Sequence, residues 1–250
     1  MASGKSYFSR KTVLVTGAAR RLGAATALAL AAKGARVVLH YNTSADQAEQ
    51  TCQRARQAGV EAWTVQADLS DPAAAAGLWD GAVALAGPVD FLINNASIFP
   101  AGRLADLTAQ DLTANVNLHA LAPLLLGRAL ADQGRAGAIV NFLDCRIDDY
   151  DREHVAYHLS KRMLFAITRM MAVEFAPAVR VNAVAPGLII PETGRGDSFS
   201  DRVIASTPLG RQGSPADVVE AVEFLLASEY VTGQVIYVDG GRHMKGAMYG

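Results

Sequence analysis

The sequence of 250 residues has few cysteines and no marked charge of either sign. Its two cysteines, Cys52 and Cys145, are far apart and form no CxxC pair, which argues against a disulfide framework and a thiolate zinc site. The formal net charge of −1 gives no basic surface on which to expect nucleic acid. The first residues, MASGKSYFSRK, lack the apolar region of a signal peptide, and we therefore expect a cytoplasmic protein.

Long hydrophobic runs are also absent. The most apolar stretch, ALAPLLLGRALA, contains an arginine and is too short to span a bilayer, so no membrane association is expected. Apolar residues nevertheless make up 51% of the chain and charged residues 19%, which is typical of a well-packed globular protein. Because the sequence contains no linker and no internal repeat, we expect one domain over residues 1–250.

Short β-branched runs alternate with helix-length segments along the whole chain. Seven runs predict strands, which begin at Thr12, Arg36, Glu61, Asp90, Ala138, Val179 and Gln234. Helices are predicted over Arg21–Lys33, Ala45–Gln57, Leu107–Leu130, Ala156–Phe175 and Pro215–Ala227. Continuous apolar strands separated by helices are typical of βαβ crossovers. The sequence therefore predicts an α/β fold with a doubly wound, Rossmann-like parallel sheet and helices on both faces.

The first predicted strand runs into a glycine-containing turn, VTGAARRLGAATALAL. Gly17 and Gly23 fit positions where the backbone turns tightly and a helix N-terminus approaches a pyrophosphate closely. An ordinary tight turn also uses glycines, so the two glycines alone are weak evidence for a phosphate-binding turn. The position of this turn, after the first strand and at the start of a helix, is what favours a dinucleotide site.

With these residues the chain resembles the short-chain dehydrogenase/reductase family over nearly its whole length. The turn TGAARRLG is similar to the family's TGxxxGxG, with Arg21 in place of the middle glycine. Further matches are NNAS at Asn94–Ser97, YxxxK at Tyr157 and Lys161, and APG at Ala185–Gly187. The resemblance implies an oxidoreductase that exchanges hydride with a nicotinamide cofactor.

The end of the second predicted strand indicates which cofactor to expect. An acid there would bind the ribose hydroxyls of NAD and repel a 2′-phosphate. This chain reads LHYNTSAD, with no acid before Asp46, and Arg21 adds a planar cation suited to phosphate. Thr43 stands where related enzymes often carry an arginine for the 2′-phosphate. NADPH is therefore expected rather than NADH.

The resemblance also implies a division of labour along the chain, with residues 9–100 mainly holding the cofactor and residues 101–250 supplying catalysis, the substrate loop and subunit contacts. The predicted cofactor-binding residues are Gly17, Arg20, Arg21, Leu22, Gly23, His40, Tyr41, Asn42, Ser44, Asp68, Leu69, Asn95, Ala96, Ser97, Tyr157, Lys161, Pro186 and Gly187.

Tyr157 and Lys161 are four residues apart, so a helix places both on one face. A phenol with a pKa of about 10 is a poor acid or base at neutral pH, and a neighbouring ammonium stabilises its phenolate form. By resemblance, Lys161 also holds the nicotinamide ribose, and Asn117 on an earlier helix continues a proton relay through water. These three residues and Asp144 form the predicted catalytic set.

Asp144 lies thirteen residues before Tyr157, where most family members carry a serine that bonds a carbonyl oxygen. An ionised carboxylate there would repel a developing alkoxide by about 4 kcal/mol at ~4 Å and an effective dielectric near 20. That energy corresponds to a rate loss of roughly a thousandfold. Reduction of a ring C=N bond is a different task, since its nitrogen must receive a proton and a carboxyl can deliver one.

The combination of Asp144, Arg21 and an aromatic residue after NNAS resembles the pteridine reductases and the bacterial dihydromonapterin and dihydrofolate reductases of this family. It implies an NADPH-dependent reductase of a pterin, with dihydrofolate as a further candidate substrate, and a homotetramer built on the long central helices. By resemblance, Phe99 would stack on the pterin. The predicted substrate-binding residues are Arg21, Ser97, Phe99, Asp144, Tyr157 and Leu188.

Two other functions stay open from the sequence. A ketone or aldehyde reductase of the same fold would need Asp144 protonated or turned aside. A catalytically silent NADP(H)-binding partner or sensor is disfavoured because the catalytic residues are intact. His154 and His158 have the spacing of a metal pair but no evident third ligand, so no metal is expected. The segment Leu188–Thr207 carries no motif that identifies a pterin side chain.

Overall fold

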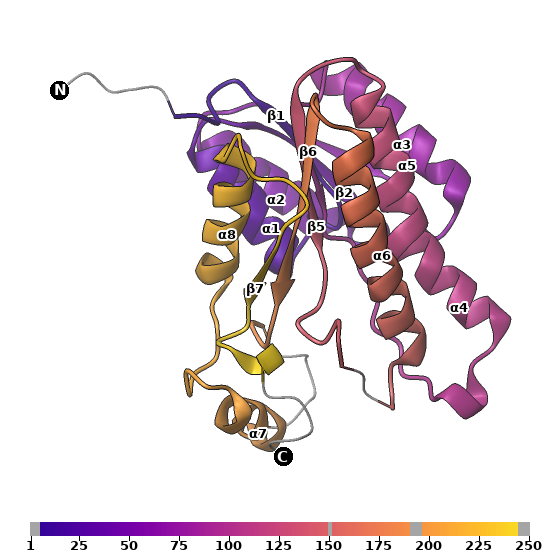
Figure 1. Cartoon of the computed structure of the whole chain (residues 1–250). Coiled ribbons are helices and arrows are strands. Elements are labelled where there is room, and N and C mark those ends of the chain that lie inside the picture. The colour runs from indigo at the N-terminus through magenta and orange to yellow at the C-terminus, as the bar shows by residue number, and fades with distance from the viewer. Residues whose placement is uncertain (1–5, 150–151, 191–196, 245–250) are drawn as a thin grey trace.

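The chain folds around one parallel sheet, seen in Figure 1 in the computed structural model, which describes residues 6–149, 152–190 and 197–244. Within those residues the sheet has the strand order β3-β2-β1-β4-β5-β6-β7. The strands are β1 Thr12–Val15, β2 Arg36–Tyr41, β3 Ala62–Gln66, β4 Phe91–Asn94, β5 Gly137–Phe142, β6 Val179–Pro186 and β7 Val235–Val238. All strand pairs are parallel, which confirms the predicted doubly wound α/β fold.

Helices cover both faces of this sheet (Figure 1). They are α1 Arg21–Ala32, α2 Ala45–Gln57, α3 Pro72–Ala86, α4 Ala109–Val116, α5 Ala122–Ala131, α6 Val155–Glu174, α7 Asp197–Ser206 and α8 Pro215–Ala227. Helices α1, α2 and α8 pack on one face, and α3, α5 and α6 pack on the other. No helix in the described part of the chain is long and apolar enough to cross a membrane.

The strands are buried on both sides, which explains their continuous apolar sequences. All four residues of β1 and of β4 are buried, and five of the six residues of β5. One apolar cluster on each face joins the sheet to its helices and contains, for example, Leu30 and Leu225 on one side and Leu78 and Leu126 on the other. These two layers fix the carboxyl ends of the strands, where the functional residues gather.

The helix predicted over Leu107–Leu130 is interrupted, which corrects the sequence-based expectation. The short 3-10 turn Leu104–Asp106 is followed by α4, a π-helical turn Asn117–Leu121 and α5. Proline has no N–H, so Pro123 cannot donate to the carbonyl of His119 four residues earlier, and the hydrogen-bond ladder shifts there.

Two helices were not named from the sequence. Helix α3 is alanine-rich and begins with Pro72 after the N-cap Asp71, whose carboxylate accepts from the N–H of Ala73. Helix α7 lies in the segment that carried no recognisable motif. Residues 191–196 of that segment lie outside the described residues.

Candidate functional site

A cleft of about 640 Å³ opens at the carboxyl ends of the parallel strands. It is lined by the segments that follow β1, β2, β3, β4, β5 and β6, and it lies where the strand order reverses between β1 and β4. Ligands of open α/β sheets bind in this crevice because the connections diverge there. The topology therefore assigns the cleft as the candidate active site.

Most of the predicted site residues are brought together by this cleft. Its walls include Gly17, Arg20, Arg21, Leu22, Gly23, His40, Tyr41, Asn42, Ser44, Asp68, Leu69, Asn95, Ala96, Ser97, Asp144, Tyr157, Lys161, Pro186, Gly187 and Leu188. Asn117 and Phe99 are the two predicted residues that are not part of the cleft wall. Both are described below.

The glycine turn after β1 is held to the end of β4 by a compact set of hydrogen bonds. The Asn95 amide donates to the carbonyls of Thr16 and Gly17 at 2.9 and 3.0 Å, and Thr16 Oγ1 accepts from the N–H of Asn95 and Ala96. Gly17 has φ of 63°, and a Cβ on it would lie 2.8 Å from Ala96 Cα. A Cβ on Gly23 would collide with the Gly17 carbonyl. The turn therefore needs both glycines, and its shape fits a pyrophosphate at the start of α1.

Arg21 adopts φ of 55° at the position of the family's middle glycine, and this is an unusual conformation for a side-chain-bearing residue. Its Nη2 donates to the carbonyl of Ile190 at 2.6 Å. The side chain thus links the phosphate turn to the loop after β6 across the cleft.

His40, at the end of β2, holds the glycine turn after β1 by a hydrogen bond. Its Nδ1 accepts from the N–H of Gly17 at 3.0 Å, so Nε2 carries the proton and donates to the Ala67 carbonyl at 3.1 Å. Burial lowers the pKa of His40 to about 4, so the ring stays neutral. Since both ring nitrogens are engaged, His40 holds the turn in place rather than offering a donor to a 2′-phosphate.

Arg20 is an exposed cation in the cleft wall and the N-cap residue of α1. Asn42, Thr43 and Ser44, which follow β2, line the same cleft and carry no negative charge. Asp68, after β3, accepts from the N–H and hydroxyl of Ser70, and these bonds lower the pKa of its carboxyl group. This wall suits an adenosine ribose that carries a 2′-phosphate.

Replacing Arg20 with alanine is expected to raise the KM for NADPH about tenfold to a hundredfold. The physical reason is the loss of a charge-assisted hydrogen bond worth about 1.5–3 kcal/mol. The KM for NADH should change by less than about threefold. Steady-state kinetics with both cofactors measure this, with Arg135→Ala on the exposed surface as the matched control. An equal rise in KM for NADPH and for NADH would contradict a role of Arg20 in binding the 2′-phosphate.

Tyr157 and Asp144 form the chemical centre of the cleft. The Tyr157 hydroxyl donates to Asp144 Oδ2 at 3.0 Å, and Asp144 Oδ1 accepts from the N–H of Arg146 at 2.8 Å. Tyr157 lies on the first turn of α6 and Asp144 just beyond the end of β5. A carboxyl and a phenol that share a hydrogen bond are able to pass a proton between them.

Lys161 is buried one helical turn after Tyr157, and its Nζ donates to the carbonyl of Phe142 at 2.6 Å. The ammonium also lies over the Tyr157 ring, 5.7 Å from its centroid. Burial lowers the pKa of Lys161 to about 8, and the negative charge of Asp144 opposes that shift. The ammonium therefore supplies positive charge beside the phenol near neutral pH.

The lowered pKa of Lys161 predicts a specific pH dependence. An unfolded lysine has a pKa of 10.5, so between pH 8 and 10.5 the folded chain binds fewer protons than the unfolded chain, and the free energy of unfolding rises with pH. Relative to Lys161→Met, the wild type should gain on the order of 2–3 kcal/mol across this window. Urea unfolding at several pH values measures the difference in free energy of unfolding between the wild type and Lys161→Met, and a difference that does not change with pH would contradict the burial effect.

Catalytic activity should decline above about pH 8, because Lys161 then loses its positive charge.

Phe99 lies at the edge of this centre. Its ring stacks on His154 with a centroid distance of 3.7 Å and meets the Tyr157 ring edge-on at 4.6 Å. The ring is 37% exposed, so an aromatic surface remains beside the phenol. The described residues contain no group of three or more metal-ligating side chains.

Asn117 does not line the cleft, and its predicted place in a proton relay stays a prediction. Its amide Nδ2 donates to the carbonyl of Ser70 at 2.9 Å, after β3. The residue two positions later, His119, is buried and meets the Tyr157 ring at 5.4 Å. His119 was not predicted from the sequence, because its side chain points inward only as a result of the π-helical turn, which rotates the following residues relative to a regular α-helix.

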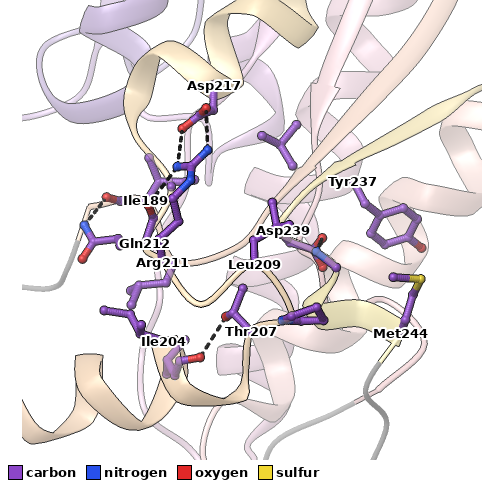
Figure 2. A pocket seen from close by; sticks show the side chains of 17 residues that line it. Ile189, Ile204, Thr207, Leu209, Arg211, Gln212, Asp217, Tyr237, Asp239 and Met244 are labelled. Atoms are coloured by element: carbon purple, nitrogen blue, oxygen red, sulfur yellow. Dashed lines mark hydrogen bonds and ion pairs between the residues drawn. The ribbon is translucent and has the colours of Figure 1, made fainter.

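A second cavity, of about 450 Å³, adjoins the cleft at Leu188 and Ile189. Figure 2 shows the side chains that line it. Its wall is tied to the loop after β6 by Gln212, whose amide donates to the Ile189 carbonyl at 2.7 Å. Arg211 faces Asp217 through two 3.5 Å contacts on the same wall (Figure 2). The lining is otherwise mostly apolar and includes residues of α7 and of the end of β7.

Comparisons with known proteins agree with this geometry. A family model described as enoyl-(acyl carrier protein) reductase matches residues 17–243. The 3-oxoacyl-[acyl-carrier-protein] reductase FabG of Staphylococcus epidermidis is 32% identical, with 94% of this chain and 99% of that protein covered.

Two solved structures are similar over nearly the whole chain. FolM alternative dihydrofolate reductase 1 from Brucella canis, complexed with NADP, has a TM-score of 0.89 and 32% identity, with 96% of this chain and 97% of that chain covered. A blue fluorescent protein from a metagenomic library, in complex with NADPH, has a TM-score of 0.88 and 32% identity, with 94% and 98% covered.

Proposed function

The chain belongs to the short-chain dehydrogenase/reductase family, and we propose that it reduces the ring C=N bond of a dihydropterin, giving a tetrahydropterin. It is an NADP-dependent oxidoreductase, in keeping with its solved neighbours that hold NADP or NADPH. Bound NADPH supplies the hydride. The other requirements of the reaction fall on residues of this chain.

The hydrogen bond from Tyr157 to Asp144 is the observation that carries the proposal. Hydride addition to the ring carbon leaves the neighbouring nitrogen in need of a proton. The Asp144 carboxylate would take the Tyr157 proton along this hydrogen bond and pass it to the nitrogen. The resulting tyrosinate would be stabilised by the Lys161 ammonium beside it.

Substrate binding would use the residues around this pair. Phe99 is a half-buried aromatic residue beside Tyr157 at the edge of the cleft, and Ser97 in the cleft wall offers a hydroxyl to the polar edge of a heteroaromatic ring. Arg21 and Leu188 come from opposite sides of the cleft. The Brucella canis neighbour, an alternative dihydrofolate reductase, supports a pterin-containing substrate, and dihydrofolate is therefore a second compound to test.

Carbonyl reduction is the second candidate, because several relatives are reductases of carbonyl compounds, including L-xylulose reductase of Mesocricetus auratus and the FabG relative. In that reaction Tyr157 would give its proton directly to the carbonyl oxygen. The acceptor next to the phenol in this chain is the Asp144 carboxyl group, which would repel the developing alkoxide if ionised. The ring C=N bond is the better match to this arrangement.

The test is NADPH oxidation by the purified protein on a 7,8-dihydropterin and on 7,8-dihydrofolate, with a small ketone and a 3-oxoacyl thioester in parallel. The proposal expects kcat/KM for a dihydropterin to exceed that for either carbonyl compound by about a hundredfold or more. Turnover of the carbonyl compounds alone would reject it in favour of the second candidate.

We also propose that four copies of the chain assemble. Helix α6 exposes the apolar side chains Leu159, Met163, Met170 and Val173, and such a stripe is typical of a subunit contact. Light scattering should then give four times the 26.4 kDa mass of the chain. A monomer at micromolar concentration would contradict this proposal without affecting the assigned chemistry.

A further inference from the structure

His119 is a buried histidine at the middle of the π-helical turn Asn117–Leu121, with 1% of its surface exposed. The turn inserts one residue into the helical ladder between α4 and α5 and directs this side chain toward the cleft wall and α6. π-helical turns are rare and often occur at functional sites. The hydrogen bonds of His119 define what it does there.

The ring of His119 connects two parts of the site. Its Nε2 accepts from the N–H of Ile98 at 3.1 Å, and Ser97 Oγ lies 3.1 Å from the same nitrogen. Its Nδ1 lies 2.8 Å from Ser160 Oγ, and the Ser160 hydroxyl itself donates to the carbonyl of Tyr157 at 2.7 Å. One ring therefore joins the segment after β4 to the first turn of α6.

These contacts allow only one protonation state. The Ile98 N–H is a donor, so Nε2 must be unprotonated. The Ser160 hydrogen is used on Tyr157, so Ser160 Oγ must accept from a protonated Nδ1. Burial and the nearby Lys161 charge also lower the pKa of His119 well below its usual value. The ring is a neutral imidazole with a fixed donor side and a fixed acceptor side.

We propose that His119 is a positioning residue of the active site, which fixes Ser97 and Ile98 through Nε2 and the turn that carries Tyr157 through Nδ1. The Ser97 hydroxyl has Nε2 at 3.1 Å and the Ile98 carbonyl at 3.4 Å as acceptors for its hydrogen, and with either acceptor its oxygen is left to accept a hydrogen bond in the cleft. An acceptor at that place favours a substrate that brings an N–H group, as a pterin ring does. This last step rests on the proposed function, whereas the positioning role does not.

Two amide variants separate the two sides of the ring. A glutamine at position 119 can place its Oε1 near the position of Nε2 and keep an acceptor for Ile98 and Ser97. An asparagine is shorter, so its amide reaches only the position of Nδ1 and leaves the Ile98 N–H without its acceptor. Leaving a buried donor unsatisfied costs enough to change a rate by roughly a factor of 5 to 150.

The experiment compares His119→Gln and His119→Asn on whichever substrate the wild type reduces, dihydropterin or ketone. The expected result is a loss in kcat/KM of less than about fivefold for Gln and of at least about thirtyfold for Asn. NADPH affinity, measured by fluorescence titration, should stay within about twofold of the wild type in both. Because the comparison is made on the wild-type substrate, failure of the pterin proposal does not affect its outcome.

The coupling to Ser97 gives an independent readout. Ser97→Ala removes the hydroxyl that bonds to His119. The double variant Ser97→Ala with His119→Asn should therefore have a kcat/KM little lower than that of the slower single variant, because both substitutions break the same hydrogen-bonded contact. If His119→Asn does not fold, the Ser97 variants provide the test. The KM for the substrate should rise by about tenfold in Ser97→Ala and stay nearly unchanged in Ser97→Thr, which keeps the hydroxyl. Equal losses in Gln and Asn, additive losses in the double variant, or equal KM values in Ala and Thr would overturn the proposal.

Discussion

Replacing Asp144 with serine is expected to lower kcat/KM for a dihydropterin by about a hundredfold to ten-thousandfold, the range typical of a lost general acid. Serine has no carboxyl group that could take the Tyr157 proton and pass it to the ring nitrogen. The same substitution should raise activity on a small ketone, because it removes a carboxylate that would repel an alkoxide by about 4 kcal/mol. A single change thus moves the two activities in opposite directions.

Two controls make this result specific. Asp144→Asn keeps the shape of the side chain and an oxygen for Tyr157 but cannot release a proton, so it should lose dihydropterin activity without gaining much on ketones. Asp148→Ser removes an exposed acid four residues further along and should leave both activities within about twofold. Full dihydropterin activity in Asp144→Ser would show that the Asp144 carboxyl group takes no part in the reaction.

The second large effect is expected at Tyr157. Tyr157→Phe should lower kcat for the physiological substrate by about a hundredfold to ten-thousandfold, because it removes the proton donor while keeping the ring that packs against Phe99 and His119. NADPH affinity should change by less than about threefold. Single-turnover measurements with bound NADPH separate the chemical step from cofactor binding.

Tyr157 and Asp144 act on one proton in this account, so their effects should not add. The double variant Tyr157→Phe with Asp144→Asn should be no slower than the slower single variant within about threefold. Tyr230→Phe, at a fully exposed tyrosine, is the matched control and should behave as the wild type. Multiplicative losses in the double variant would mean that the two residues serve separate steps.

Much of the fold was predictable because its signals are local. Apolar runs such as TVLV of β1 and FLIN of β4 are buried on both sides, and only strands of a covered parallel sheet need such sequences. The glycine turn was predictable for a similar reason, since Gly17 and Gly23 occupy places where a Cβ does not fit.

The parts that the sequence did not reveal depend on contacts between distant segments. His119 becomes part of the site only because Pro123 disturbs the helix and the π-helical turn redirects the ring. His40 was expected at the cofactor, yet its buried ring is used on Gly17 and Ala67. The hydrogen-bond partners of a polar side chain follow from tertiary packing, which no spacing of residues encodes.

The second cavity has a bearing on the substrate side chain. It adjoins the cleft at Leu188 and Ile189, and its lining includes residues of α7, which lies in the segment without a motif for a pterin side chain. Its lining is largely apolar with Arg211 at one wall (Figure 2). Comparison of dihydropterins with short and long side chains in the turnover assay will show whether side-chain length matters.

In the proposed reaction, hydride is added to a ring carbon beside a nitrogen. The most direct measurement uses NADPH deuterated at C4 of the nicotinamide, in separate samples for its two faces, and locates deuterium in the product of 7,8-dihydropterin reduction by NMR. Transfer is expected from one face of the nicotinamide only, with one deuterium at C6 of the tetrahydropterin. Product without deuterium at C6, or label found only in the alcohol formed from a ketone, would contradict it.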